Sequence, residues 1–238
     1  VNISSYLGTS YNRIISANES VISENSFSYT VVSTYLLSDF IRTEGSENNR
    51  SVVENNIINI DVSRPTELQD AGGVIWLGGH TDCINNTLSR QCGSSSSEYS
   101  PLIKINGAGN IISGNTLYDS QKINTVKFSY STNTIFTNNI IHTARDNAAI
   151  ELSNSEVLIS HNLIESEGRG IEMNNQSGGE IINNTIVSPN SADYGIHISN
   201  LSAPVVQNNI IEGFTNGIYA ENDLQNQFIQ NNNFWDIS

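Results

Sequence analysis

The sequence predicts an all-β fold, a right-handed single-stranded parallel β-helix of about nine to ten coils. Three observations predict it: a motif built on Asn recurs along the chain, a second short strand recurs between its copies, and no helical period persists. Asn occurs 35 times in 238 residues, and it favours turns and stacked side-chain ladders. We expect one domain over residues 1–238, with excision from a longer chain left open.

The first repeated element places an apolar residue three positions before an Asn, which we name the anchor, and further apolar residues after it. A short strand with period two cannot bury its apolar face alone, so successive coils stack and their anchors meet at one corner. Subtracting successive anchor numbers gives spacings of 31, 30, 29, 24, 23, 22, 25 and 24 residues. The anchors are Asn25, Asn56, Asn86, Asn115, Asn139, Asn162, Asn184, Asn209 and Asn233.

The second repeated element is an apolar-polar-apolar strand between anchors. Its middle residue is expected to face outward, and stacking places one such residue per coil in a column, about 4.8 Å apart. Insertions in the first three coils, at 28–40, 59–73 and 89–101, all precede this strand, and insertions gathered on one face often mark the binding face. The column reads Arg42, Trp76, Lys104, Lys127, Glu151, Glu172, His197 and Tyr219.

Four residues of this column are candidate catalytic groups. Lys104 and Lys127, one coil apart, could serve a lyase as base and as the cation that stabilises the resulting charge. Glu151 and Glu172, also one coil apart, could form the carboxylate pair of a retaining glycosidase, whose carboxyls lie about 5–5.5 Å apart. The alternatives are that both Glu bind Ca²⁺ with Asp146 or Glu167, or that Lys127 and Glu151 form a structural cross-strand ion pair.

The other four residues of the column are candidates for substrate binding. Trp76 and Tyr219 could stack on sugar rings, and Arg42 could hold a carboxylate or sulfate. His197 completes this set and is expected at the surface. His161 takes the place of the first Asn in an anchor pair, so its expected role is structural.

Charge and composition restrict the partners and the compartment. The net charge of −14 argues against nucleic acid and against an anionic membrane surface, and no apolar run approaches the length of a membrane span. The acidic residues make Ca²⁺ a candidate ligand, but no cofactor is predicted firmly. Cys83 and Cys92 fit no common zinc spacing, and we predict a local disulfide and a secreted location, with two free thiols as the alternative.

The two motifs together resemble a known superfamily. Gly-Ile-x-apolar, as at 170–173 and 195–198, alternates with Ile-x-x-Asn-x-Ile, as at 159–164. The pattern resembles the right-handed β-helix repeats of the pectin-lyase-like and NosD-like superfamily over about residues 20–238. That superfamily holds lyases, hydrolases, epimerases, phage depolymerases, adhesins and copper-site maturation proteins, so the resemblance implies a fold and not one function.

The sequence departs from the enzyme families within that resemblance. The Asp pair and Gly-His-Gly segment of the pectin-cleaving hydrolases and the Asp-Pro-His motif of the uronate epimerases are absent. Lyases of the alginate and chondroitin type place Lys and Arg on successive coils, whereas this chain has Lys104 followed by Lys127. No family's catalytic set therefore transfers residue by residue.

Three functions remain open at this point. The favoured one is a secreted module that engages a polysaccharide or cell-surface glycan along the column, with cleavage by a lyase or glycosidase mechanism undecided. The alternative is a non-catalytic adhesive or structural β-helix that binds glycans or stacks end to end. Metal delivery is the weakest, because one Met and four scattered His make a poor copper site.

Overall fold

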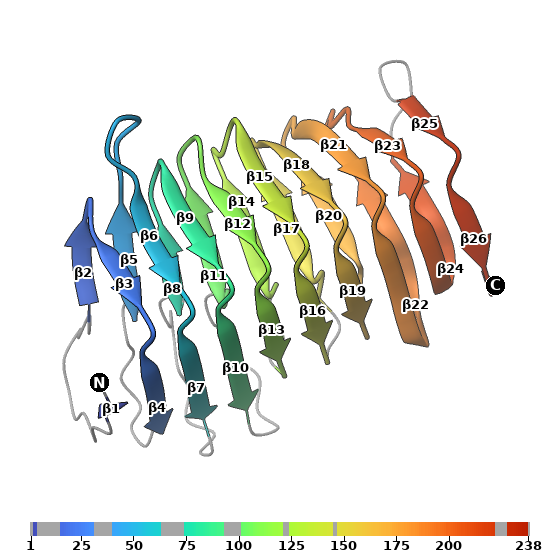
Figure 1. The fold of residues 1–238 in the computed structure, drawn as a ribbon. Coiled ribbons are helices and arrows are strands. Elements are labelled where there is room, and N and C mark those ends of the chain that lie inside the picture. Colours follow the sequence, from blue (N-terminus) through green and yellow to red (C-terminus); the bar gives the residue numbers. More distant parts are fainter. Residues whose placement is uncertain are drawn as a thin grey trace.

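A computed structural model describes residues 2–3, 15–30, 40–62, 74–92, 101–120, 124–144, 147–221 and 228–237. Every element of regular secondary structure in these ranges is a strand, and every pairing between named strands is parallel. The coils follow one another in chain order from the N-terminal to the C-terminal end of the stack (Figure 1). The predicted right-handed parallel β-helix is confirmed.

Each coil contributes one strand to each of three stacked sets, which we name faces 1, 2 and 3. Face 1 carries the predicted column. It consists of β2 (Ile15–Asn18), β5 (Ile41–Glu44), β8 (Ile75–Leu77), β11 (Ile103–Asn106), β14 (Val126–Ser129), β17 (Ile150–Ser153), β20 (Ile171–Asn174) and the second parts of β22 (Thr185–Ile198) and β24 (Ile210–Ala220).

Face 2 forms a sheet of nine strands within the described residues. They are β3 (Val21–Ser23), β6 (Ser51–Glu54), β9 (Thr81–Ile84), β12 (Ile111–Ser113), β15 (Thr134–Thr137), β18 (Glu156–Ser160), β21 (Gly178–Ile182), β23 (Val205–Gln207) and β25 (Phe228–Gln230).

Face 3 begins directly after each anchor. It consists of β1 (Asn2–Ile3), β4 (Ser26–Thr30), β7 (Ile57–Val62), β10 (Thr87–Cys92), β13 (Thr116–Asp119), β16 (Ile140–Thr143), β19 (Leu163–Ser166), the first parts of β22 and β24, and β26 (Asn233–Trp235). Because β22 and β24 run through the corner without a break, faces 1 and 3 join there into one sheet.

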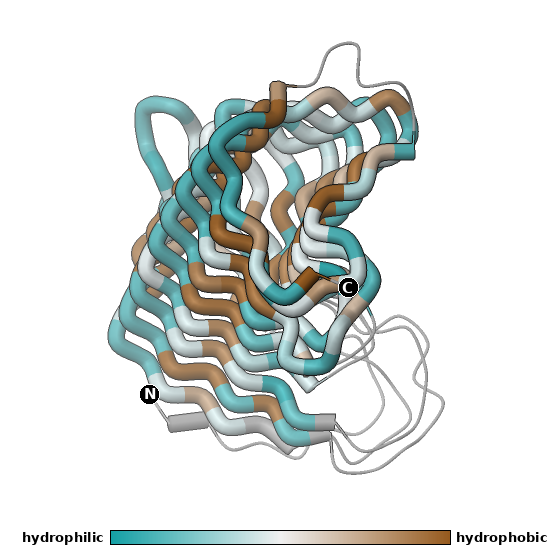
Figure 2. The backbone as a smooth tube through the Cα atoms, turned by 90° about the vertical axis from the view of Figure 1, so that its right-hand side faces the viewer, coloured by the Kyte–Doolittle hydropathy of each residue, from teal (hydrophilic) through white to brown (hydrophobic). Residues whose placement is uncertain are grey.

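The core lies inside the coils, where the three faces turn their apolar residues inward. Alternate residues of each strand are buried, as in Ile150 and Leu152 of β17, both fully enclosed. Phe128 and Phe136 meet edge to face with ring centroids 5.7 Å apart. Hydrophobic positions therefore follow one another from coil to coil as stripes (Figure 2).

The anchors form a continuous side-chain ladder at the corner between faces 2 and 3. The Asn115 amide accepts a hydrogen bond from Asn86 Nδ2 at 3.0 Å and donates one to Asn139 Oδ1 at 3.0 Å. The residue before each anchor has a positive φ, including His161 at 55°. Asn tolerates this left-handed conformation, which explains the recurrent Asn-Asn pairs and confirms the structural role of His161.

The predicted last anchor is wrong by one residue. Asn209 Nδ2 donates to Asn232 Oδ1 at 2.9 Å, and Ile210 pairs with Asn233, so the ladder ends at Asn232. Three consecutive Asn, 231–233, offered three candidates, and only the register with the neighbouring coil distinguishes them.

A second ladder, of hydroxyl side chains, lies at the corner between faces 1 and 2. The backbone N–H of Ser131 donates to Ser155 Oγ at 3.1 Å, and those of Ser155 and Ser177 repeat the bond one coil further on. These Ser side chains are buried and satisfy N–H groups at the bend, as the Asn anchors do at theirs.

Cys83 is a free, buried thiol, so the predicted disulfide with Cys92 is not formed. Cys83 points into the core from β9, in register with Val53 and Ile112, and its sulfur lies 3.4 Å from Asn86 Nδ2. Burial raises the pKa of this thiol to about 12. The spacing of the two Cys suggested a loop, but Cys83 occupies an ordinary inward strand position.

Close contact between coils explains the Gly that precedes the second element. A Cβ on Gly195 would lie 2.4 Å from Ile211 Cγ2 and 2.6 Å from the Gly217 carbonyl oxygen. We therefore expect Gly195→Ala to lower the free energy of unfolding by about 1–3 kcal/mol in urea denaturation followed by circular dichroism. Gly178→Ala is the control, because its Cβ would meet nothing closer than 3.9 Å. Equal effects of the two substitutions would contradict this explanation.

The predicted insertions lie largely outside the described residues. The described residues stop at Thr30, Val62 and Cys92, at the ends of strands of face 3, and resume at 40, 74 and 101, before strands of face 1. The residues that flank the three insertions therefore lie at the same corner of consecutive coils, as the sequence predicted.

Candidate functional site

The outward column on face 1 has the register that the sequence predicted. Arg42 pairs with Trp76, Trp76 with Lys104 and Lys104 with Lys127 in adjacent strands. The register then continues through Glu151, Glu172, His197 and Tyr219. All eight predicted residues therefore stand in one row, each on its own coil.

The N-terminal end of the column joins an aromatic ring to a cation. The Arg42 guanidinium carbon lies 3.9 Å from the centroid of the Trp76 ring, so Arg42 covers one face of the indole. Lys104 follows on the next coil, and no carboxylate of the described residues lies within ion-pair distance of its ammonium. Lys104 is therefore available to a ligand.

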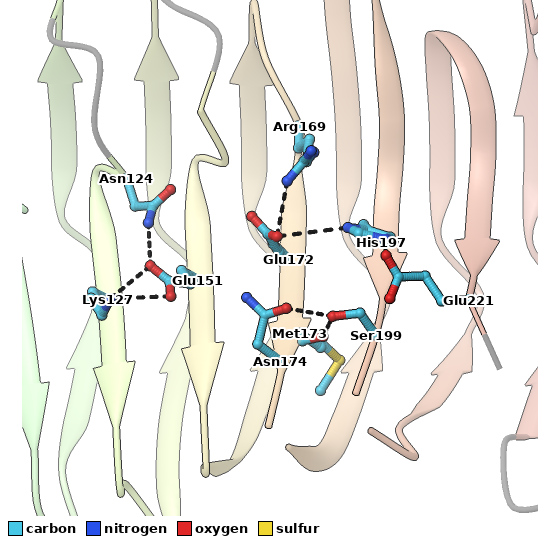
Figure 3. Close-up of polar contacts among 10 residues, drawn as sticks. All are labelled: Asn124, Lys127, Glu151, Arg169, Glu172, Met173, Asn174, His197, Ser199 and Glu221. Carbon is cyan, nitrogen blue, oxygen red and sulfur yellow. Dashed lines mark hydrogen bonds and ion pairs between the residues drawn. The ribbon is translucent and has the colours of Figure 1, made fainter. Parts of the chain in front are cut away.

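The middle of the column holds a hydrogen-bonded ion pair (Figure 3). Lys127 Nζ lies 3.0 Å from Glu151 Oε2 and 3.1 Å from Oε1. Asn124, which precedes β14, donates a further hydrogen bond to Glu151 Oε2. Both oxygens of this carboxylate are thus occupied, as the structural alternative for the pair required.

A second group of polar side chains follows toward the C-terminal end (Figure 3). Arg169 lies in the turn before β20, and its Nη1 is 2.9 Å from Glu172 Oε1. His197 Nδ1 is 3.7 Å from the same oxygen, while its Nε2 is 3.1 Å from Glu221 Oε1. His197 thus lies between two carboxylates from neighbouring coils.

His197 is buried, so the expectation that it lies at the surface is wrong. Only 6% of it is exposed, because Tyr194 stacks on it with centroids 5.0 Å apart and Tyr219 stacks on Tyr194 at 4.8 Å. Tyr219 itself stays 40% exposed. The sequence missed Tyr194, which lies three residues before His197 on the same strand and closes this cluster.

These contacts limit the chemistry of the column. Glu151 and Glu172 stand on adjacent coils, as the glycosidase hypothesis required, but each is held by a cation. Lys127 is likewise neutralised by Glu151, whereas the lyase hypothesis needs it as a free base or cation. Three of the four candidate catalytic residues are therefore engaged in ion pairs, and Lys104 alone has no carboxylate partner among the described residues.

A metal centre has no support within the described residues. No group of three or more His, Cys, Asp or Glu side chains there could hold a metal ion, so Glu151, Glu172 and Glu167 form no such site. Asp146, the other predicted Ca²⁺ partner, lies outside the described residues. In the described part of the chain, no helix has the length and apolar character needed to cross a membrane.

A second outward row, on face 3, was missed at the sequence level. It stands three residues after each anchor, where Tyr118, His142 and Glu165 succeed one another in register. The sequence holds the signal for this row, because a count of three residues from each anchor yields these side chains. A hollow of about 240 Å³ adjoins these side chains.

A match to a family model supports the architecture. A family model described as a right-handed beta helix region matches residues 71–234. The solved structure of the Streptococcus pneumoniae surface protein and adhesin PfbA is similar over 92% of this chain and 90% of that chain, with 10% identity and a TM-score of 0.30. No curated protein matches the chain.

Proposed function

The chain belongs to the family of right-handed β-helix regions, and on that premise we propose that it binds a polysaccharide along the column of face 1. The observation that carries the proposal is the continuous register of polar and aromatic side chains from Arg42 to Tyr219, of which only His197 is buried. A row with a repeat of about 4.8 Å matches an extended, repetitive ligand better than a compact one. The proposal includes a secreted or cell-surface location, where such ligands are found.

Order within the column favours binding. Side chains that are held in ion pairs and ring stacks lose little conformational entropy when a ligand arrives. Lys127 with Glu151, Arg169 with Glu172, and Tyr194 with Tyr219 are all fixed in this way. The ligand would thus meet a rigid surface with hydrogen-bonding groups on successive coils.

The charges favour a neutral or sparsely charged polymer. Lys127 and Arg169 are neutralised by their carboxylate partners, and Arg42 lies against Trp76. Among the described residues of the column, only Arg42 and Lys104 are cations without a carboxylate partner, and a polyanion would be repelled by a chain of net charge −14. An occasional acidic sugar could be placed at Lys104.

Cleavage is the second candidate, and the adjacent positions of Glu151 and Glu172 favour it. A reducing-end assay on each bound polysaccharide tests it, with Glu151→Gln and Glu172→Gln as variants. Product that disappears in either variant establishes cleavage, and product without ultraviolet absorbance distinguishes a glycosidase from a lyase. Binding without product would indicate a non-catalytic module. End-to-end self-association is then a further prediction, which sedimentation experiments would test.

We expect Trp76→Ala to weaken binding to a polysaccharide roughly 10-fold, because large aromatic side chains dominate binding energy at such surfaces. The measurement is affinity electrophoresis or calorimetry against neutral and acidic polysaccharides. Trp235→Ala is the matched control, since Trp235 is 65% exposed on face 3, outside the column. Equal losses in both variants, or no affinity for any polymer, would sink the proposal.

A further inference from the structure

We propose that the hollow on face 3 beside Tyr118, His142 and Glu165 is a separate binding site for one neutral, hydroxyl-rich sugar ring. It is formed at the ends of β10, β13, β16 and β19, away from the strands that carry the column. Nothing in the proposed binding along face 1 uses these residues.

The aromatic floor of the site is a pair of parallel rings. Tyr118 and His142 stack with centroids 4.9 Å apart and an interplanar angle of 1°. Tyr118 remains 45% exposed, and its neighbour on the preceding coil is the small Ser89. A broad ring that is stacked on one side and next to a small residue on the other suits contact with the apolar face of a sugar.

The polar side of the site carries two carboxylates, which accept hydrogen bonds. His142 Nδ1 lies 2.9 Å from Glu165 Oε2, which fixes the imidazole ring. Glu165 keeps its second oxygen for a ligand, and Glu167 also lines the hollow. Carboxylate oxygens accept hydrogen bonds only, so they select a ligand rich in hydroxyl donors.

The described charged residues that line the hollow disfavour an anionic ligand. The one Arg among them, Arg90, is 4% exposed and forms an ion pair with Asp119, with Nη2 2.6 Å from Oδ2 and Nε 3.1 Å from Oδ1. The other charged side chains of the described lining, Glu165 and Glu167, are acidic. These groups would repel a uronate or a sulfated sugar, whereas they would not repel a neutral sugar.

The volume of the hollow suits one sugar ring. A volume of about 240 Å³ falls below the range of about 300–1,000 Å³ that holds drug-sized molecules. One pyranose ring is the unit that matches it, as the end or a branch of a glycan. A single ring with a few hydrogen bonds is expected to bind in the millimolar range.

The test is a titration of the whole protein with neutral methyl hexopyranosides, followed by the NMR signals of the His142 ring. We expect saturable shifts for at least one neutral glycoside, and smaller shifts for the corresponding uronate. Tyr118→Ala should abolish them, Tyr118→Phe should preserve them because the ring remains, and Glu165→Gln should weaken binding several-fold. Tyr118 faces outward, so the fold of each variant is checked by circular dichroism and is expected to persist.

Two results would overturn the inference. One is the lack of a saturable His142 shift with every neutral glycoside tested. The other is a shift that survives Tyr118→Ala. Trp76→Ala, which alters the column on face 1, should leave this titration unchanged, so failure of the face 1 proposal and failure of this one are distinguishable.

Discussion

Replacing Asp119 by Ala is expected to lower the free energy of unfolding by about 3–5 kcal/mol, because it leaves the Arg90 guanidinium buried without its carboxylate. The side chains of Arg90 and Asp119 are only 4% and 0% exposed, and their two contacts of 3.1 and 2.6 Å join adjacent coils. A charge removed from water is costly unless it is paired. Equilibrium denaturation in urea, followed by circular dichroism, measures the loss.

The chain supplies its own control for this prediction. Arg50 and Asp82 form the same type of pair between adjacent coils, with Arg50 Nε 2.9 Å from Asp82 Oδ1, but their side chains are 30% and 19% exposed. Water can solvate Arg50 once Asp82 is lost, so Asp82→Ala should cost less than about 1 kcal/mol. Equal losses for the two Asp variants would show that burial does not set the effect.

A double variant separates the charge from the packing. Arg90→Met with Asp119→Leu removes both charges and keeps apolar volume, and such replacements of buried pairs are often neutral or stabilising. We expect it to recover most of the stability lost in Asp119→Ala. If the double variant is as unstable as Asp119→Ala, the ion pair itself stabilises the contact between the coils. The loss in Asp119→Ala would then not come from leaving the Arg90 charge buried without its carboxylate.

The sequence predicted the features that recur once in every coil. The anchors and the apolar-polar-apolar strands recur in every coil, so the column from Arg42 to Tyr219 could be aligned by counting alone. The same counting failed at Asn231–Asn233, because three consecutive Asn fit the motif equally well. It also did not reveal the Ser ladder, because Ser is frequent throughout the chain.

What could not be predicted depends on side-chain contacts across coils. The period of the chain places Lys127 beside Glu151. It does not place Arg169 beside Glu172, because Arg169 lies in a turn. It does not place Tyr194 over His197 either, because Tyr194 lies outside the column. The burial of Cys83 depends likewise on strand phase, which its spacing from Cys92 does not give. The eight residues of the column were therefore predictable, but the residues that pair with them were not.

Replacing Asn115 by Ala is expected to lower the free energy of unfolding by about 3–5 kcal/mol. The Asn115 side chain is fully buried, and both its oxygen and its nitrogen are hydrogen-bonded. Its Oδ1 accepts from the backbone N–H and Nδ2 of Asn86 at 2.9 and 3.0 Å, and its Nδ2 donates to the Cys83 carbonyl and Asn139 Oδ1 at 2.9 and 3.0 Å. Each buried group left unsatisfied costs about 1–3 kcal/mol, and repacking recovers part of the sum. Urea denaturation followed by circular dichroism measures the loss.

The substitution Asn115→Asp tests whether the loss comes from hydrogen bonding or from volume. Asp has nearly the same shape, but as a carboxylate it cannot donate, so it places negative charge against the Cys83 carbonyl and Asn139 Oδ1. If hydrogen bonding dominates, the Asp variant will be at least as unstable as the Ala variant at neutral pH. Asn106→Ala, at an exposed position of β11, should change stability by less than about 0.5 kcal/mol. An Asn115→Asp variant close to wild type would instead assign the role of the anchor to shape, and the ladder would then be a consequence of the stacking rather than its cause.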